Sequence, residues 1–406
     1  MLNLPFLASI PIAAVLASLA NAAPVLFTSV EIDPDTGFSR AVIVPPSALA
    51  HTAQFQPQNE SGEVVGRGQA DVQAGRVLDN LAAALAEAKT SLDQLVKLNV
   101  YARNTETVAV IKRVLAERLH GPVKPAVTFV TGQMAHPDAL LAMDAVAVAS
   151  AISEHAALLR SGKLFGENAA HVAVLPPGGH VYIAGQAEPG SLAEATRKTL
   201  ESLESTLKFL GLDHTHVVSV KSFLQPISRL NEARVEIVKH FRGQQVPPLV
   251  FVEWTMTNPI EIEMIVAAWQ AATQAKDVIE YLTPPGMTAS PIYSRVARVN
   301  RGDVIYTGGL HGPSGVSGEA QVRDIFAQLK GLLEKSGSDF RHMAKATYYV
   351  SDNDTSSMLN KIRPGFYDPK RPPAASKAMV PGVGLESRSI TLDMIAVRQP
   401  AASARP

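Results

Sequence analysis

The chain of 406 residues repeats one pattern three times, at spacings of 119 to 130 residues. Each copy has apolar residues at helical spacing, followed by a stretch in which apolar and polar residues alternate as in a strand. These patterns predict helices over 71–88, 192–210 and 322–334, and strands over 96–101, 217–223 and 345–350. We therefore expect a fold that is built from three similar units.

The part of each copy that follows this strand also repeats. A second, shorter helix is predicted over 105–119, 230–241 and 356–362. A stretch that starts with proline comes next, at Pro125, Pro247 and Pro372. Each copy then ends in an apolar strand with an acidic residue inside it, and these acids are Asp144, Glu263 and Asp393. The order of elements is typical of an α+β fold.

The last strand of each copy is apolar on both faces. In the first copy Leu141 and Met143 share one face, and Asp144 lies between Ala142 and Val146 on the other. Side chains alternate across a strand, so helices can cover only one of these faces. The other face needs a second sheet, which three copies can supply to one another around a pseudo-threefold axis.

Composition and charge exclude several classes of protein. The 37 basic and 37 acidic side chains give a formal net charge of zero, so nothing indicates the cationic surface of a nucleic-acid binder. The absence of cysteine excludes disulfides, thiolate nucleophiles and cysteine-ligated metal centres. The pair His214 and His216 lacks a clear third ligand, so we expect a polar turn there and no metal site.

The first 30 residues contain no charged side chain, and the apolar stretch 4–19 is followed by Ala20, Asn21 and Ala22. This pattern predicts a secretory signal peptide over 1–22 and hence an exported, periplasmic or secreted, protein. The alternatives are a misassigned start or an ordinary buried segment. No other segment has the roughly 18 uncharged apolar residues that a membrane span requires.

At the repeated positions the chain resembles the RidA family, also called YjgF and formerly grouped with L-PSP endoribonucleases. In the first copy the resemblance is carried by 74–81 (AGRVLDNL) and 97–101 (KLNVY). In the third copy it is carried by 290–294 (SPIYS) and 305–309 (IYTGG), and in the second by 182–186 (YIAGQ). It covers nearly the whole chain beyond the signal segment.

The resemblance implies three tandem chorismate-mutase-like modules in one polypeptide. Family members are typically homotrimers with a ligand cleft at each subunit interface, so this chain is expected to be a monomeric pseudo-trimer. The active members hydrolyse reactive 2-imino and enamino acids to 2-oxo acids and ammonia, without a metal or cofactor. The domains implied are a signal peptide (1–22), three repeats (23–155, 156–272 and 273–400) and a tail (401–406).

The chain departs from the family where the deaminases bind the substrate carboxylate. The arginine of their Pro-Ala-Arg-Ser motif is matched by Val127, Leu249 and Ala375, none of which can bind a carboxylate. Lys377 and Arg388 are the nearby cations that could replace it. Lys377 shares the strand face of Ala375 and is the better candidate, although a solvated surface lysine is the alternative.

The acids that match the family's water-orienting residue are the predicted catalytic groups. The prediction favours Glu263 and Asp393 over Asp144, and the alternative is a structural role for all three carboxylates. The predicted substrate-binding residues, by resemblance to the family's motifs, are Tyr293, Gly185, Gly308, Gly309, Asn231, Asn360 and Lys377.

These residues leave three hypotheses open. The first is a hydrolytic deaminase of small imines or enamines, or of amides, that lack an essential carboxylate. The second is a protein that binds a small molecule in its clefts without turnover. The third is a structural protein whose clefts have degenerated.

Overall fold

The computed structural model describes residues 27–166, 168–241, 245–268 and 275–398. The predicted signal segment, 1–22, and the predicted tail, 401–406, lie outside the described residues. Within the described part of the chain, no helix is both long and apolar enough to cross a membrane.

All six predicted helices are present, to within a few residues at their ends. They are α1 (Ala70–Glu87), α2 (Thr105–Arg118), α3 (Leu192–Phe209), α4 (Leu230–His240), α5 (Gly318–Lys335) and α6 (Asn353–Ile362). Four of them begin after a side chain that accepts a hydrogen bond from the amide three residues on; these N-caps are Asn104, Ser191, Ser317 and Asp352. Such caps satisfy backbone donors that the first helical turn leaves free.

Nineteen strands lie in the described residues. The first nine are β1 (Thr28–Ile32), β2 (Ser39–Val44), β3 (Ala48–Thr52), β4 (Leu95–Ala102), β5 (Ala126–Thr131), β6 (Leu141–Ala149), β7 (Ala157–Leu159), β8 (Val172–Leu175) and β9 (His180–Gln186). The others are β10 (Val217–Leu224), β11 (Leu249–Glu253), β12 (Ile260–Ala267), β13 (Ile279–Leu282), β14 (Val296–Val299), β15 (Asp303–Thr307), β16 (Leu310–His311), β17 (Met343–Val350), β18 (Ala374–Met379) and β19 (Ile390–Arg398).

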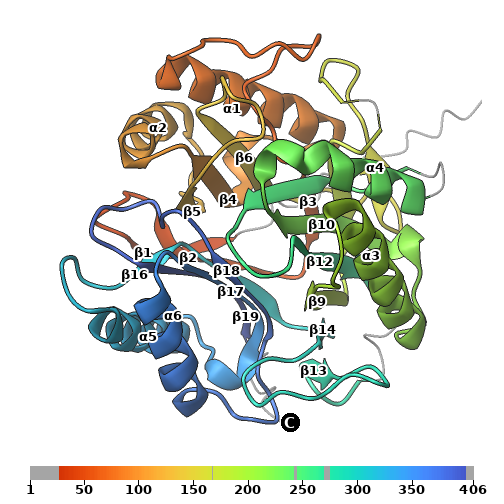
Figure 1. The fold of residues 1–406 in the computed structure, drawn as a ribbon, viewed down its shortest axis with the longest axis vertical. Helices are drawn as coiled ribbons and strands as arrows, with labels where there is room; N and C mark the ends of the chain where they lie inside the picture. The colour runs from red at the N-terminus through yellow and green to blue at the C-terminus, as the bar shows by residue number, and fades with distance from the viewer. Residues whose placement is uncertain (1–26, 167, 242–244, 269–274, 399–406) are drawn as a thin grey trace, which may run out of the picture.

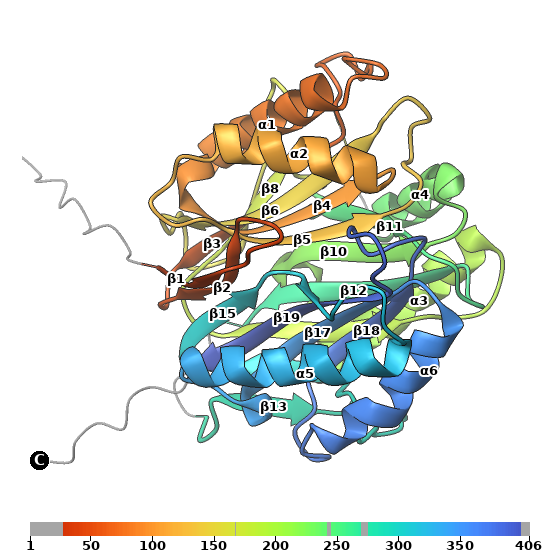
Figure 2. The same ribbon diagram turned by 90° about the vertical axis from the view of Figure 1, so that its left-hand side faces the viewer.

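We refer to residues 39–149, 172–267 and 296–398 as units 1, 2 and 3. In each unit the strand after the first helix lies between two others, one parallel and one antiparallel. The three triplets are β5-β4-β6, β11-β10-β12 and β18-β17-β19. Three pairs of helices lie on the outside and the strands lie in the centre (Figure 1). In the second view, α1 and α2 cover one side of the strands and α5 and α6 the opposite side (Figure 2).

The first strand of each unit pairs with the second strand of the preceding unit. Thus β8 of unit 2 pairs with β3, and β14 of unit 3 pairs with β9. The series closes on itself, because β2 at the start of unit 1 pairs with β15 of unit 3. Each unit therefore completes the sheet of its neighbour, and the first and third units are held together by strand pairing.

Both predicted faces of the last strand are confirmed. Leu141 and Met143 pack with α1 and α2 in an apolar cluster on the helix side of unit 1. On the other face, Val146 belongs to a central cluster that also includes Tyr182 of unit 2 and Ile395 of unit 3. The centre of the molecule is thus formed by all three units.

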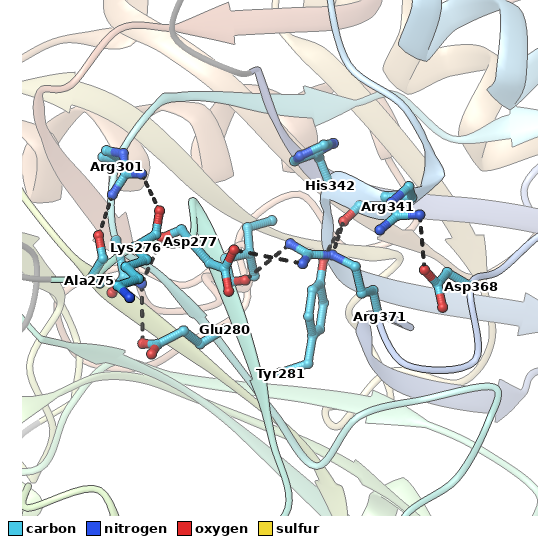
Figure 3. A network of polar contacts seen from close by, with 12 residues as sticks. Ala275, Lys276, Asp277, Glu280, Tyr281, Arg301, Arg341, His342, Asp368 and Arg371 are labelled. Atoms are coloured by element: carbon cyan, nitrogen blue, oxygen red, sulfur yellow. Dashed lines mark hydrogen bonds and ion pairs between the residues drawn. The ribbon is translucent and has the colours of Figure 1, made fainter.

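Contacts with Arg341 and Arg371 position the segment before unit 3, which includes Asp277 and Tyr281 (Figure 3). The Tyr281 hydroxyl lies 2.9 Å from the carbonyl oxygens of Arg341 and Met343. The guanidinium of Arg371 lies 5.3 Å from the centre of the Tyr281 ring and forms an ion pair of 3.9 Å with Asp277. These contacts hold β13 against unit 3.

Candidate functional site

The three middle strands turn side chains towards the centre of the molecule, and all but one of these side chains are polar or carry a hydroxyl group. Because side chains alternate along a strand, each middle strand contributes three of them in succession. They are Lys97, Asn99 and Tyr101 of β4, Ser219, Lys221 and Phe223 of β10, and Lys345, Thr347 and Tyr349 of β17. Positions that correspond in the three units thus lie in layers, and lysine occupies the first position in units 1 and 3 only.

The three predicted catalytic acids meet at this centre. Asp144 lies opposite Asn99, Glu263 opposite Lys221, and Asp393 opposite Thr347 in the strand pairing. All three acids are buried and line one cavity of about 70 Å³. A cavity of this size has room for a few water molecules.

Two of the acids form ion pairs with lysines of a neighbouring unit. Lys97 Nζ of unit 1 lies 2.9 Å from Asp393 Oδ1 of unit 3. Lys345 Nζ of unit 3 lies 2.9 Å from Glu263 Oε1 of unit 2, and Ser376 Oγ donates to Glu263 Oε2 at 2.8 Å. Both favoured catalytic acids are therefore compensated by buried cations that hold the units together.

The electrostatics of Asp393 are consistent with this pairing. Burial acts to raise its pKa, but Lys97 and the two other lysines outweigh burial, and the pKa lies below its usual range. Lys97 in turn donates to Thr128 Oγ1 at 2.6 Å and to the carbonyl oxygen of Thr307 at 2.7 Å. Each N–H group of this ammonium therefore has an acceptor.

Asp144 differs because the position that would supply its lysine is Ser219. Its Oδ2 accepts a hydrogen bond of 2.8 Å from Asn99 Nδ2. Its Oδ1 is buried and has no hydrogen-bond partner among the described residues, and neither has Asn99 Oδ1. Burial raises the pKa of Asp144 above its usual range, although Lys221, Asn99 and the Tyr101 hydroxyl act against this rise. Of the three acids that line the cavity, Asp144 is the one that forms no ion pair with a lysine in the described residues.

Lys221 also lines the cavity, with its ammonium held by aromatic rings. Its Nζ donates to the hydroxyl of Tyr349 at 2.8 Å. The ring centres of Tyr101, Phe223 and Tyr349 lie 5.5 to 5.8 Å from this atom, within the range of cation–π attraction. Unlike Lys97 and Lys345, it forms no ion pair within the described part of the chain.

Glu261 lies two residues before Glu263 on the same strand face and was not among the predicted site residues. Burial raises its pKa to about 7, and the neighbouring charge of Glu263 acts in the same direction. Its Oε1 is buried without a hydrogen-bond partner in the described residues. Gly185 leaves the space for it, since a Cβ at that glycine would lie 2.0 Å from Glu261 Oε1. The period-two spacing of Glu261 and Glu263 is the signal that could have identified it.

A second, smaller cavity of about 20 Å³ lies at the boundary of units 1 and 2. Gln54 of unit 1 closes one side, where its amide nitrogen Nε2 donates to the carbonyl oxygen of Phe251 at 2.9 Å. Tyr101 and Ala142 form another part of its wall. The ring of Tyr101 thus lies between this cavity and the ammonium of Lys221.

The positions that match the family's arginine hold apolar residues in a common register. Val127 lies opposite Leu98, Leu249 opposite Val220, and Ala375 opposite Ala346. Each of the three packs in, or against, the apolar cluster on the helix side of its own unit.

The predicted substrate-binding residues are dispersed. Lys377 and Asn360 do meet on the helix side of unit 3, where Lys377 Nζ lies 3.0 Å from Ser356 Oγ and 3.4 Å from Asn360 Oδ1. Arg388, the other candidate cation, lies 3.5 Å from Asp35. None of these residues lines the central cavity.

The other predicted binding residues lie elsewhere. Asn231 is exposed on α4. Tyr293 precedes β14 and stacks on the guanidinium of Arg295 at 5.0 Å. Gly308 and Gly309 pack against the backbone of unit 1, where a Cβ at Gly308 would lie 2.9 Å from the carbonyl oxygen of Ser39. Close packing of the units thus accounts for these two glycines.

In the described residues, no group of three or more histidine, aspartate and glutamate side chains is arranged to hold a metal ion.

The comparisons with known proteins concern about a third of the chain each. The family model described as endoribonuclease L-PSP matches residues 28–149, which include all of unit 1. A RutC family protein of Pyrococcus abyssi is 32% identical over 123 residues, which are 30% of this chain and 94% of that protein.

Solved structures show similar coverage. A Rid-family protein of Yersinia pestis is 26% identical, with a TM-score of 0.28, over 30% of this chain and 98% of its own. Yeast Mmf1 is 25% identical, with a TM-score of 0.24, over 31% of this chain and 100% of its own.

Proposed function

The chain belongs to the RidA (YjgF) family, and on this premise we propose that it hydrolyses small reactive imines or enamines in the central cavity, next to Asp144. The observation that carries the proposal is that Asp144 lines the cavity and that its buried Oδ1 has no hydrogen-bond partner among the described residues. Buried polar atoms nearly always have a partner, so an unpartnered carboxylate oxygen on a cavity indicates a place for water or a ligand.

The reaction needs one water molecule and a group that can accept and return a proton. Asp144, in its ionised form, takes a proton from water while the water oxygen bonds to the imine carbon and the C=N double bond becomes single. The nitrogen of this adduct takes the proton that Asp144 now carries and becomes an amine. Asp144 then moves the hydroxyl proton to this amine, and the C–N bond breaks as the C=O bond forms. The products are the carbonyl compound and ammonia, and Asp144 is regenerated as the carboxylate.

The raised pKa of Asp144 suits this role. A general base is more effective when its pKa lies closer to the working pH, and burial moves this carboxyl in that direction. Glu263 and Asp393 are less suitable, because each of them forms an ion pair with a buried lysine.

The test is ammonia release from freshly generated 2-iminopropanoate and from a neutral imine of similar size. Asp144→Asn keeps the shape of the side chain and removes its basicity. We expect it to lower the rate by roughly 10²- to 10⁴-fold while the thermal unfolding temperature stays close to that of the wild type. Ammonia release that is equal in the two proteins, or absent with every imine tested, would contradict the proposed activity.

A second candidate is a protein that binds a small molecule without turnover. It is favoured by the apolar residues at Val127, Leu249 and Ala375, because no guanidinium is present there to hold a substrate carboxylate. In this case Asp144→Asn would change the affinity for the ligand, and neither protein would release ammonia.

We further propose that units 1, 2 and 3 are three family modules, bounded at 23–155, 156–272 and 273–400, and that the chain works as a monomeric pseudo-trimer. The closed series of strand pairs and the two ion pairs between units support this arrangement. Light scattering at several concentrations should give the mass of one chain, about 43.2 kDa before any processing. A mass that is three times larger would contradict it.

Export is a separate proposal that rests on the apolar segment 4–19 and on Ala20–Asn21–Ala22. Cell fractionation with N-terminal sequencing is the test. We expect mature protein that starts at residue 23; intracellular protein that retains residue 1 would contradict it.

A further inference from the structure

The lysine of unit 2 lies one step further along its strand than the lysines of units 1 and 3. Lys97 and Lys345 occupy the first inward position, whereas unit 2 has Ser219 there and Lys221 at the next inward position. Since side chains two residues apart share a strand face, Lys221 still points to the centre. It lies opposite Glu263 in the strand pairing, but Lys345 already compensates that acid.

This displacement leaves one cation and one acid without an ion pair in the same cavity, among the described residues. The three lysines and three acids would form three pairs between units if the positions were equivalent. Two pairs are formed, Lys97 with Asp393 and Lys345 with Glu263. Lys221 and Asp144 are the remaining members, and both line the cavity without an ion pair to each other.

The ammonium of Lys221 is well placed to bind a ligand. An ammonium has three N–H donors, and the hydroxyl of Tyr349 accepts one of them. The surrounding rings of Tyr101, Phe223 and Tyr349 favour a positive charge without neutralising it. A carboxylate in the cavity could therefore accept a charge-assisted hydrogen bond from Nζ.

We infer that Lys221 binds the carboxylate of a small ligand in the central cavity, and so supplies the anion-binding group that the apolar residues at Val127, Leu249 and Ala375 cannot provide. This role of Lys221 rests on the proposed function and deepens it, because it names the residue that holds the carboxylate of an imine or enamine substrate. Its carboxylate lies on Lys221 and its reacting carbon lies towards Asp144. Ser219, which is short, leaves the room that a lysine fills in the other two units.

The test measures the binding of acetate by titration calorimetry or by NMR. Acetamide, which has the same shape and no charge, is the control ligand. We expect the wild-type chain to bind acetate more tightly than acetamide. Lys221→Met keeps the length of the side chain and removes the charge, and it should weaken acetate binding at least tenfold. Lys330→Met, an exposed lysine of α5, is the matched control and should bind acetate as the wild type does.

A second variant tests the argument from the three pairs and does not depend on the folding of Lys221→Met. Ser219→Lys restores a lysine at the first inward position of unit 2, where it can pair with Asp144 and fill the cavity. We expect it to fold and to lose acetate binding at least tenfold although Lys221 is still present. Acetate binding that is equal in the wild type and in Ser219→Lys would overturn the inference, as would equal affinity for acetate and acetamide.

These outcomes are distinguishable from failure of the proposed function. Acetate binding that depends on Lys221, in a protein that releases no ammonia from any imine, supports the anion site and contradicts the hydrolase. Ammonia release that is unchanged in Lys221→Met, together with acetate binding that is also unchanged, supports the hydrolase and contradicts the anion site.

Discussion

Lys97 Nζ lies 2.9 Å from Asp393 Oδ1, in a buried ion pair that joins the first unit to the third. Lys345 joins the third unit to the second in the same way, through Glu263. The series runs around the centre of the molecule in one direction and stops at Ser219, which cannot form an ion pair with Asp144. At two of the three corresponding positions a lysine therefore holds two units together through an ion pair. At the third position, Ser219, no lysine is present, and Asp144 has no ion pair in the described residues.

The first prediction concerns the stability that the ion pair provides. Lys97→Met leaves the Asp393 carboxylate buried without its cation, and we expect the free energy of unfolding in urea to fall by about 3–5 kcal/mol. Lys330→Met removes an exposed ion pair with Glu334 and should change the unfolding free energy by less than about 1 kcal/mol. Equal effects of the two substitutions would show that the buried pair does not stabilise the contact between units.

The second prediction concerns the pH dependence of hydrolysis. If Asp144 acts as a base, the rate rises with pH through a pKa that lies above the usual range of an aspartate, because burial raises that pKa. The positive charge of Lys221 acts to lower it. We therefore expect the rise in kcat to move to higher pH in Lys221→Met, and a shift to lower pH would contradict the assignment.

The third prediction concerns Glu261, whose pKa is about 7 in the folded chain against 4.5 as the ordinary value. Between these two pH values the folded state binds more protons than the unfolded state, so this group makes the protein less stable as pH rises. Glu261→Gln removes the effect. The variant should gain about 1–3 kcal/mol in unfolding free energy over the wild type between pH 4.5 and pH 7. A gain that does not depend on pH would contradict the raised pKa.

The fourth prediction concerns two buried histidines. Burial lowers the pKa of His51 to about 3 and that of His180 to about 4, from 6.5. Below pH 6.5 the unfolded chain thus binds more protons than the folded chain. The unfolding free energy therefore falls as the pH falls, by about 1.4 kcal/mol per pH unit for each histidine. Between pH 6.5 and pH 4.5, the unfolding free energy of His180→Gln, measured in urea, should fall by about 1.4 kcal/mol less per pH unit than that of the wild type. An unchanged slope would show that His180 is protonated in the folded chain.

The fifth prediction distinguishes packing from ligand binding at Gly308. A Cβ there would lie 2.9 Å from a backbone oxygen of unit 1, so Gly308→Ala should destabilise the chain by about 1–3 kcal/mol. Gly331→Ala is the control, because this glycine of α5 has open space around it and alanine favours a helix. Thermal unfolding of the two variants is the measurement. Similar unfolding temperatures for both would contradict close packing at Gly308.

The sequence by itself determined the repeat, the six helices, the strands and the inward position of Asp144, Glu263 and Asp393. These features depend on periodicities of 3.6 and 2 residues, which are local and can be read from neighbouring positions. Family membership followed from the same stretches, since their motifs lie within single helices and strands.

Only the tertiary structure decided which of the three acids forms no ion pair with a lysine. The pairing of Lys97 with Asp393, and of Lys345 with Glu263, joins strands that are far apart in the sequence, and no local pattern indicates which lysine reaches which acid. The same holds for the strand pairing between units and for the half-buried Glu261, because burial and charge compensation depend on what the neighbouring units bring to the centre.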